Sequence, residues 1–156
     1  GDGLLCHPLI SRSYLEDVLT PSVMSGRAAN ERPFEIATMA MVTSGRTEEE
    51  LTKAIEGTRK QIGFYASTPA YKPVLDHHGW GDLHYAAHSL TKQGRWDELA
   101  NLIDDTVLGT FAVVGEIKDV GPALRKRFAG AADRVTLSLP YPDDADLALD
   151  VITAAR

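Results

Sequence analysis

Aromatic rings and histidines are concentrated in one stretch of this sequence. Residues 64–88 read FYASTPAYKPVLDHHGWGDLHYAAH and contain four of the chain's five histidines. Histidine ligates metals and changes charge near neutral pH, whereas aromatic side chains line pockets for organic molecules. The stretch could therefore hold a metal, bind a substrate, or be connecting structure that is rich in rings.

A zinc site can be drawn in this stretch because His84 and His88, four residues apart, would share one face of a helix. Further ligands would come from Asp76, His77, His78 and Asp82. The ligand patterns of zinc enzymes, such as HExxH, are missing. We therefore interpret these histidines as surface or packing residues and predict no metal site.

Four of the rings are better candidates for lining a pocket, namely Tyr65, Tyr71, His78 and Trp80. Long irregular insertions in compact domains are often functional lids, and rings beside small polar residues suit a partly apolar organic substrate. The alternative is that these rings only cover an apolar rim. The residues alone fit both interpretations.

The elements that position these residues belong to a chain of 156 residues, the length of one ordinary domain. No apolar run approaches the roughly 20 residues that span a bilayer, which argues against a membrane role. A net charge of -6 and one short basic cluster argue against nucleic acid. The single cysteine, Cys6, excludes an internal disulfide and fits a reducing cytosol, so we expect a cytoplasmic protein in which Cys6 is buried and inert.

Four strand–helix units follow one another along the chain. Short apolar runs predict strands at 4–6, 34–42, 111–114 and 134–139, and helical periodicity follows each of them. The first strand looks buried on both faces. Between the second and third units lies an insertion at about 67–109, which we expect to be irregular over 67–81 and helical over 83–90 and 96–108.

Local signals mark the starts of three of the helices. Thr47 and Glu50 form a capping box at the start of the second helix. The third helix is predicted from residue 119, which places Pro122 in its first turn. Asp143 or Asp144 caps the last helix.

Consecutive units of this kind predict an α/β fold with a parallel sheet and right-handed crossovers. The sheet could be open and doubly wound, or it could be half of an eight-stranded TIM barrel. A barrel usually needs about 250 residues, so half of one would leave its first and fourth strands in need of a partner. Because the chain begins abruptly at Gly1, as if cut from a longer protein, we predict a half-barrel that forms a single domain over 1–156.

Three segments are similar to a known family: DGLLCHP near the start, IGFYASTPAYKPVLDHHGWGDL in the middle, and FAVVGEIKDVGPALRKRF followed by DRVTLSLPY. Their order and spacing resemble the carboxyl-terminal half of the luciferase-like monooxygenase superfamily, and within it the deazaflavin (coenzyme F420)-dependent oxidoreductases. The resemblance implies strands five to eight of a barrel. The first four strands, with much of the family's cofactor phosphate site, would lie outside this chain.

The resemblance also implies a site at the carboxyl ends of the strands. His7 would be catalytic and contact the cofactor. The other implied cofactor contacts are Pro8, Thr43 with Ser44 beside it, Val114 and Gly115. The segment from Leu139 to Tyr141 follows the last strand, and Tyr141 would bind substrate together with Tyr65, Tyr71, His78 and Trp80.

Several of these residues have plainer interpretations. His7 could be a strand-end histidine bonded to backbone, and Gly115 could serve only a tight turn, since Glu116 beside it would repel a phosphate. The basic run from Arg125 to Arg127 reads as the solvated face of a helix.

The leading hypothesis is an oxidoreductase that transfers hydride between F420, or alternatively FMN, and a small organic substrate, with little turnover by this piece alone. Its partner would be the missing amino-terminal half-barrel or a second copy of the chain. A rival hypothesis is a half-barrel that self-associates as a structural or binding module without catalysis. Another is a small open-sheet ligand-binding domain, which a reversal of the strand order would indicate.

Overall fold

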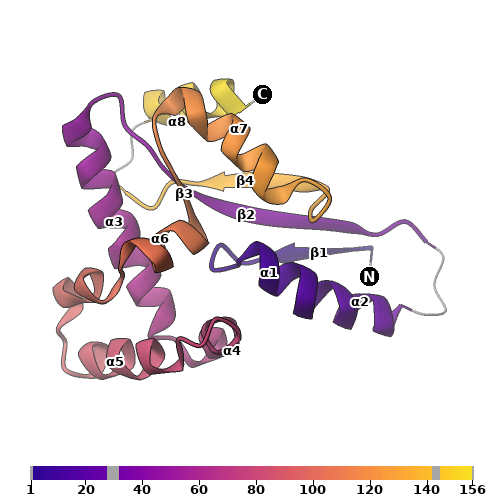
Figure 1. The fold of residues 1–156 in the computed structure, drawn as a ribbon, viewed down its shortest axis with the longest axis horizontal. Helices are drawn as coiled ribbons and strands as arrows, with labels where there is room; N and C mark the ends of the chain where they lie inside the picture. The colour runs from indigo at the N-terminus through magenta and orange to yellow at the C-terminus, as the bar shows by residue number, and fades with distance from the viewer. Residues whose placement is uncertain (1, 28–31, 142–144, 156) are drawn as a thin grey trace.

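The protein has an α/β fold in which helices cover both faces of a four-stranded parallel sheet (Figure 1). The structure is a computed structural model that describes residues 2–27, 32–141 and 145–155. Its strands are β1 (Gly3–Cys6), β2 (Glu35–Thr43), β3 (Ala112–Val114) and β4 (Arg134–Ser138). All four predicted strands are therefore present, with bounds shifted by a residue.

The central strand β2 pairs with each of the other three. Ala37 of β2 pairs with Leu5 of β1 and with Arg134 of β4. Further along β2, Met41 pairs with Ala112 of β3 and also with Ser138 of β4. Because a strand has only two edges, β1 and β3 follow one another along one edge of β2, and β4 lies along the other.

This strand order differs from the predicted barrel order, in which consecutive strands pair and β3 would lie beside β4. The chain instead turns back between β2 and β3, so that β3 and β4 lie on opposite edges of β2. Strand length gives the physical reason. The nine residues of β2 offer β4 a ladder of five residue pairs, whereas β3 has three residues in all.

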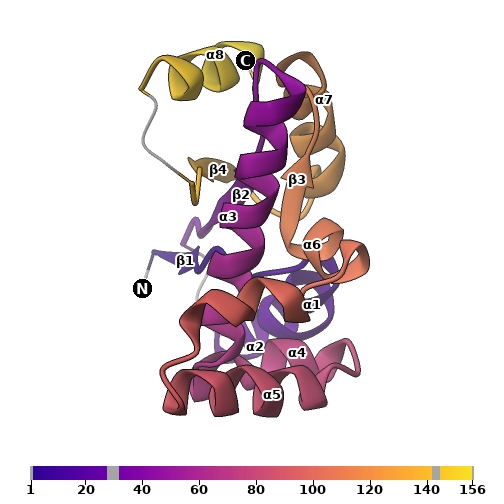
Figure 2. The ribbon, with the colours of Figure 1, turned by 90° about the vertical axis from the view of Figure 1, so that its left-hand side faces the viewer.

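The two faces of β2 are covered by different helices. Ile36 packs under the helical segment formed by α1 (Arg12–Tyr14), η1 (Leu15–Leu19) and α2 (Thr20–Gly26). On the same face, Ala40 and Val42 pack against α7 (Ile117–Phe128) and α8 (Ala145–Ala155). The opposite face carries α3 (Glu48–Ala66), which stands in front of the sheet in Figure 2.

The insertion between α3 and β3 is helical throughout most of its length. It contains η2 (Pro69–Tyr71), α4 (Lys72–His77), α5 (Gly81–Lys92), η3 (Trp96–Leu102) and α6 (Asp105–Phe111). The expectation of irregular structure over 67–81 is wrong, because Pro69 and Pro73 each fall in the first turn of a helix, where a missing N–H costs nothing.

The largest apolar core of the described residues joins this insertion to the sheet. Ile62 of α3, Leu75 of α4, Leu99 of η3 and Phe111 of α6 are fully buried there, together with Leu9 after β1. The rings of the stretch 64–88 therefore surround a real hydrophobic core rather than a free loop.

The outer strands are more exposed than the sequence indicated. Only Cys6 of β1 is buried, and Leu5 is 69 % exposed. The predicted burial of β1 on both faces is wrong, because α1 and α2 cover one face of it and α3 lies too far along β2 to cover the other. Cys6 itself is buried as expected, and burial raises the pKa of its thiol.

Helix starts were predicted with mixed success. The Thr47 cap is confirmed, since its hydroxyl accepts a hydrogen bond from the N–H of Glu50. Helix α7 begins at Ile117, two residues early, so Pro122 lies inside the helix and not in its first turn. The cap by Asp143 or Asp144 falls outside the described residues.

Arg125 and Lys126 of the basic run in α7 are exposed, as predicted for the solvated face of a helix, whereas Arg127 is half-buried. Arg127 donates to the carbonyls of Gly109 and Thr110 at the end of α6, and Arg125 donates to Ala155 at the end of α8. A guanidinium at a helix carboxyl terminus satisfies carbonyls that lack an intrahelical partner. These arginines therefore connect α7 to α6 and α8.

None of the helices in the described ranges combines the length and the apolar character that a membrane crossing requires.

Candidate functional site

Three rings are in contact directly after the carboxyl end of β1. His7 stacks on Tyr71 of η2, with ring centroids 4.3 Å apart and planes 22° apart, and it meets Tyr65 of α3 edge-on at 4.5 Å. The two tyrosine rings are 5.8 Å apart. We call His7, Tyr65 and Tyr71 the ring cluster. All three are half-buried, so a ligand could reach them.

One hydrogen bond determines the tautomer of His7. The N–H of Leu9 donates to His7 Nδ1 at 3.1 Å, so the proton of the neutral imidazole is on Nε2. The buried Pro8 between them fixes the backbone at this turn. Burial lowers the pKa of His7, which favours the neutral ring at pH 7. His7 is therefore suited to donate a hydrogen bond from Nε2, as to a carbonyl oxygen, rather than to carry a charge.

Tyr65 is held by a residue one helical turn before it. Burial raises the pKa of the Tyr65 hydroxyl, and a hydrogen bond with the Gln61 side chain opposes that rise. The phenol therefore keeps its proton near neutral pH. Sequence reasoning missed Gln61, although its position four residues before Tyr65 on a helix was a usable signal.

His78 and Trp80 form a second pair on the same core. Their rings stack at 4.7 Å, and both meet Phe111 edge-on at about 6 Å. His78 Nε2 lies 2.8 Å from the hydroxyl of Ser11, which ties the insertion to the segment after β1. Burial first, and the neighbouring His77 second, lower the pKa of His78. Sequence reasoning also missed Ser11, for which no signal beyond its place before a helix was available.

The residues that follow β2 and β3 form a different group. The hydroxyls of Thr43 and Thr58 are 2.7 Å apart, and the Gly115 N–H donates to the Thr43 carbonyl at 3.1 Å. Ser44 donates from its hydroxyl to the Gly115 carbonyl and from its N–H to the Tyr141 hydroxyl. We call these five residues the strand-end cluster. The residues of this cluster form these hydrogen bonds with one another and not with a ligand.

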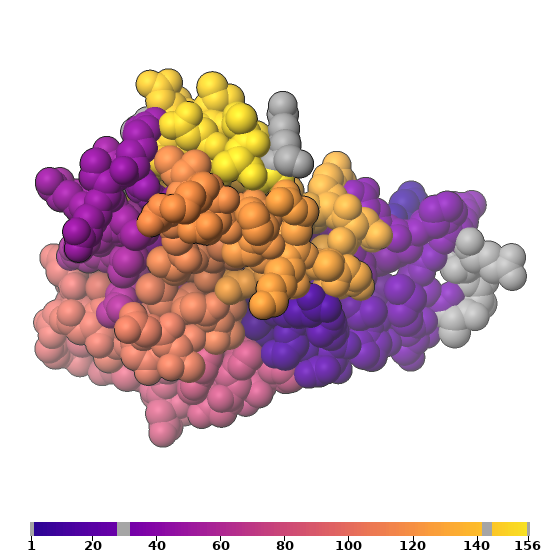
Figure 3. Space-filling model, turned by 45° about the horizontal axis from the view of Figure 1, so that its top comes forward, coloured from indigo at the N-terminus to yellow at the C-terminus, as the bar shows by residue number. Residues whose placement is uncertain are grey.

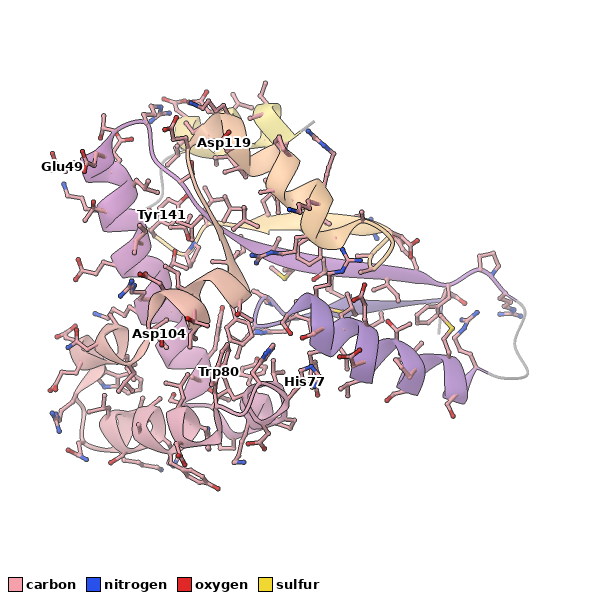
Figure 4. The ribbon with its side chains drawn as sticks, viewed as in Figure 1. Glu49, His77, Trp80, Asp104, Asp119 and Tyr141 are labelled. Carbon is pink, nitrogen blue, oxygen red and sulfur yellow. The ribbon has the colours of Figure 1, made fainter. Side chains whose placement is uncertain are left out.

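The register of β1 separates the two groups. Cys6, just before His7, pairs with Thr38, five residues short of Thr43. His7 is therefore level with a point four residues before the end of β2, which at about 3.3 Å per residue is roughly 13 Å from that end. Figure 4 likewise shows Tyr141 beside α3 and well away from Trp80. The predicted residues therefore form two sites, because strand ends that follow one another in sequence are not level in this sheet.

A polar hollow of about 660 Å³ opens beyond the strand-end cluster, between the starts of α3 and α7. Its charged lining residues are Arg46, Glu48, Glu116 and Lys118. Lys118 pairs with Glu116 at 2.8 Å, and Arg46 pairs with Asp150 of α8. Two cations are thus balanced by two carboxylates, which does not favour a polyanion. Val114, the last residue of β3, is 37 % exposed.

His84 and His88 of α5 bond to backbone carbonyls. His84 Nδ1 lies 2.8 Å from the Ala66 carbonyl and His88 Nδ1 lies 3.0 Å from the Ser67 carbonyl, both at the end of α3. Across the described ranges, three or more His, Cys, Asp or Glu side chains nowhere gather as a metal would require. These histidines fasten α5 to α3.

Known proteins resemble this chain in both sequence and fold. The sequence profile of the luciferase-like monooxygenases matches residues 1–134. The chain belongs to the luciferase-like monooxygenase family. Uncharacterized proteins of Mycobacterium bovis and Mycobacterium tuberculosis are 48 % identical to this luciferase-like chain over 138 residues. Those matches cover 86 % of the chain and 41 % of each relative, so the chain spans about two fifths of their length.

A solved structure shares the fold. The coenzyme F420-dependent tetrahydromethanopterin reductase of Methanopyrus kandleri superposes with a TM-score of 0.74 at 18 % identity. The superposition covers 97 % of the luciferase-like chain and 43 % of the reductase. The α/β fold with a parallel sheet is therefore similar to that of this reductase, while the low identity leaves the chemistry to be argued from residues.

Proposed function

We propose that this chain is part of an oxidoreductase that transfers hydride between a deazaflavin, coenzyme F420, and a small organic substrate. FMN is the alternative cofactor. The observation that carries the proposal is the ring cluster, in which a neutral histidine with a free Nε2–H lies among half-buried tyrosines at the end of a parallel strand. The family match and the F420-dependent structural neighbour support it.

The conjugated ring of such a cofactor fits the residues of this chain, whereas its phosphate-bearing part does not. A flat conjugated ring could stack against the ring cluster or against Trp80, since aromatic faces favour such contacts. The phosphate-bearing part does not fit the polar hollow, where Glu48 and Glu116 offset Arg46 and Lys118. We therefore propose that Thr43, Val114 and Gly115 shape the backbone near the cofactor without binding its phosphates, which would be bound outside this chain.

Each residue of the proposed site has a definite task. The cofactor, when bound, would supply the hydride donor or acceptor. His7 would donate from Nε2 to a carbonyl oxygen and so favour negative charge that develops there. Tyr71 would keep the imidazole ring in plane, and Trp80 with His78 would exclude water from the apolar side of the substrate.

The chain would function within a longer cytoplasmic protein. We propose that β1 and β4, whose outer edges pair with no other described strand, join further strands to complete a TIM-type barrel. The chain alone would have little turnover, because a substantial part of the barrel mouth would be missing.

Cofactor titrations test the proposal. F420 and FMN are added separately to the longer protein and to residues 1–156, and binding is followed by cofactor fluorescence. We expect the longer protein to bind one of the two and residues 1–156 to bind it weakly or not at all. If the longer protein binds neither, the proposal is wrong.

A second candidate function is self-association without catalysis, and one observation favours it. An apolar hollow of about 760 Å³ runs along β4 between α7 and α8, which lie side by side in Figure 3. Phe128, Leu137 and Ile152 are among its lining residues. A second copy pairing along β4 would cover these side chains. Sedimentation at low concentration tests this, since a stable monomer contradicts pairing along β4.

A further inference from the structure

A separate aromatic hollow of about 350 Å³ lies between α3, η3 and the segment after β4. Its outer wall consists of Phe64 of α3 and Trp96 of η3, with ring centroids 6.2 Å apart and planes tilted by 39°. Phe64 is 43 % exposed and Trp96 is 46 % exposed. Two large neighbouring rings are thus partly open to water, which is a typical feature of binding sites.

The floor of this hollow is apolar. Tyr141 lines it, and the Tyr141 hydroxyl is bonded to the N–H of Ser44 in the strand-end cluster. Gly57 of α3 lies against Tyr141, and a side chain at position 57 would begin 3.0 Å from the Tyr141 Cβ. Tyr141 therefore lies directly against α3 at this hollow, and its hydroxyl is already bonded to Ser44.

A single charge lies at the rim. Of the described residues that line the hollow, Lys60 alone is charged. Its ammonium group pairs with Asp97, whose side chain is 93 % exposed. An ion pair with so exposed a partner contributes little free energy. An anionic ligand could therefore replace the Asp97 carboxylate at Lys60.

We propose that this hollow binds a planar aromatic carboxylate. The flat ring would lie against Trp96 and Phe64, and the carboxylate would pair with Lys60. The apolar floor accounts for the ring, and the single cation accounts for the charge. Gln61 also lines the hollow and bonds to Tyr65 of the ring cluster, so an occupant would lie one residue away from the proposed oxidoreductase site. The proposal does not depend on that function.

Calorimetric titration with 2-naphthoate as the probe tests the proposal, with 2-naphthamide as its neutral counterpart. We expect 2-naphthoate to bind and 2-naphthamide to bind about two- to fivefold more weakly, the range for a solvent-exposed ion pair. Lys60→Gln should remove this difference. Lys53→Gln is the matched control, because Lys53 is on the same helix and also forms an exposed ion pair, with Glu49.

Two substitutions test the aromatic wall. Trp96→Ala and Phe64→Ala should each weaken 2-naphthoate binding about tenfold, as truncation of a central aromatic contact does. Both side chains are partly exposed, so the variants should fold, and circular dichroism checks this. Unchanged affinity in both folded variants, or no binding of 2-naphthoate at millimolar concentration, would overturn the proposal. Equal affinity for acid and amide would overturn its carboxylate part.

Discussion

The ring cluster and the strand-end cluster both contain predicted site residues, but they differ in burial and in whether their hydrogen-bonding groups are available to a ligand. Thr43 and Ser44 of the strand-end cluster are fully buried, and each hydroxyl there bonds to another group within the cluster. In the ring cluster, His7 Nε2 is left available by its one hydrogen bond, and all three rings are half-buried.

This difference separates a structural group from a candidate binding group. A buried polar group that is already bonded has nothing to offer a ligand, and removing its partner costs stability. A half-buried ring already contacts water, and a hydrogen-bond donor without a protein partner can bond to a ligand, so such a group is suited to binding. We therefore expect changes in the strand-end cluster to affect folding and changes around the ring cluster to affect binding.

The largest effect should come from Thr58→Val. Valine matches threonine in shape but leaves the Thr43 hydroxyl buried without its partner. We expect the free energy of unfolding to fall by about 1–3 kcal/mol, measured by urea denaturation. Thr52→Val on the exposed side of α3 is the control, since its hydroxyl also bonds one turn back along the helix. An equal loss in both variants would contradict a special role for the buried pair.

A smaller effect, on binding rather than folding, is expected for Trp80→Ala. In the longer protein this change should weaken binding of the cofactor by about tenfold, because a stacked aromatic wall is lost. Fluorescence titration measures the affinity, and thermal unfolding measures the stability. Tyr85→Ala removes a ring that is 62 % exposed on α5 and should change neither. Loss of stability without loss of affinity would instead favour a packing role for Trp80.

The smallest effect should be a dependence of stability on pH. Burial lowers the pKa of both His7 and His78 below the usual value of about 6.5. The unfolded chain therefore binds protons first as the pH falls, so stability is full above about pH 7 and declines below it. Thermal unfolding at pH 7.5 and 5.5 measures the decline, which the double variant His7→Asn, His78→Gln should reduce. An undiminished decline would assign it to other groups.

Much of the fold could be predicted because its signals are local. The four strands, the Thr47 cap and the order of strand–helix units depend on apolar periodicity and capping over a few residues. His7 contacts Tyr65 and Tyr71, and the roles predicted for these three residues stay predictions. The sequence segments also predicted the family correctly.

The remainder depended on competition between distant parts of the chain. Any parallel strand can bond to any other, so the sequence alone does not determine that β4 takes the edge of β2 opposite β3. Nor does it determine that Cys6 pairs with Thr38, which places His7 far behind Thr43 and divides the predicted site in two. The amino-acid sequence by itself determined which elements form, whereas only the tertiary structure decided which of them pair and in what register, because backbone hydrogen bonds carry no side-chain identity.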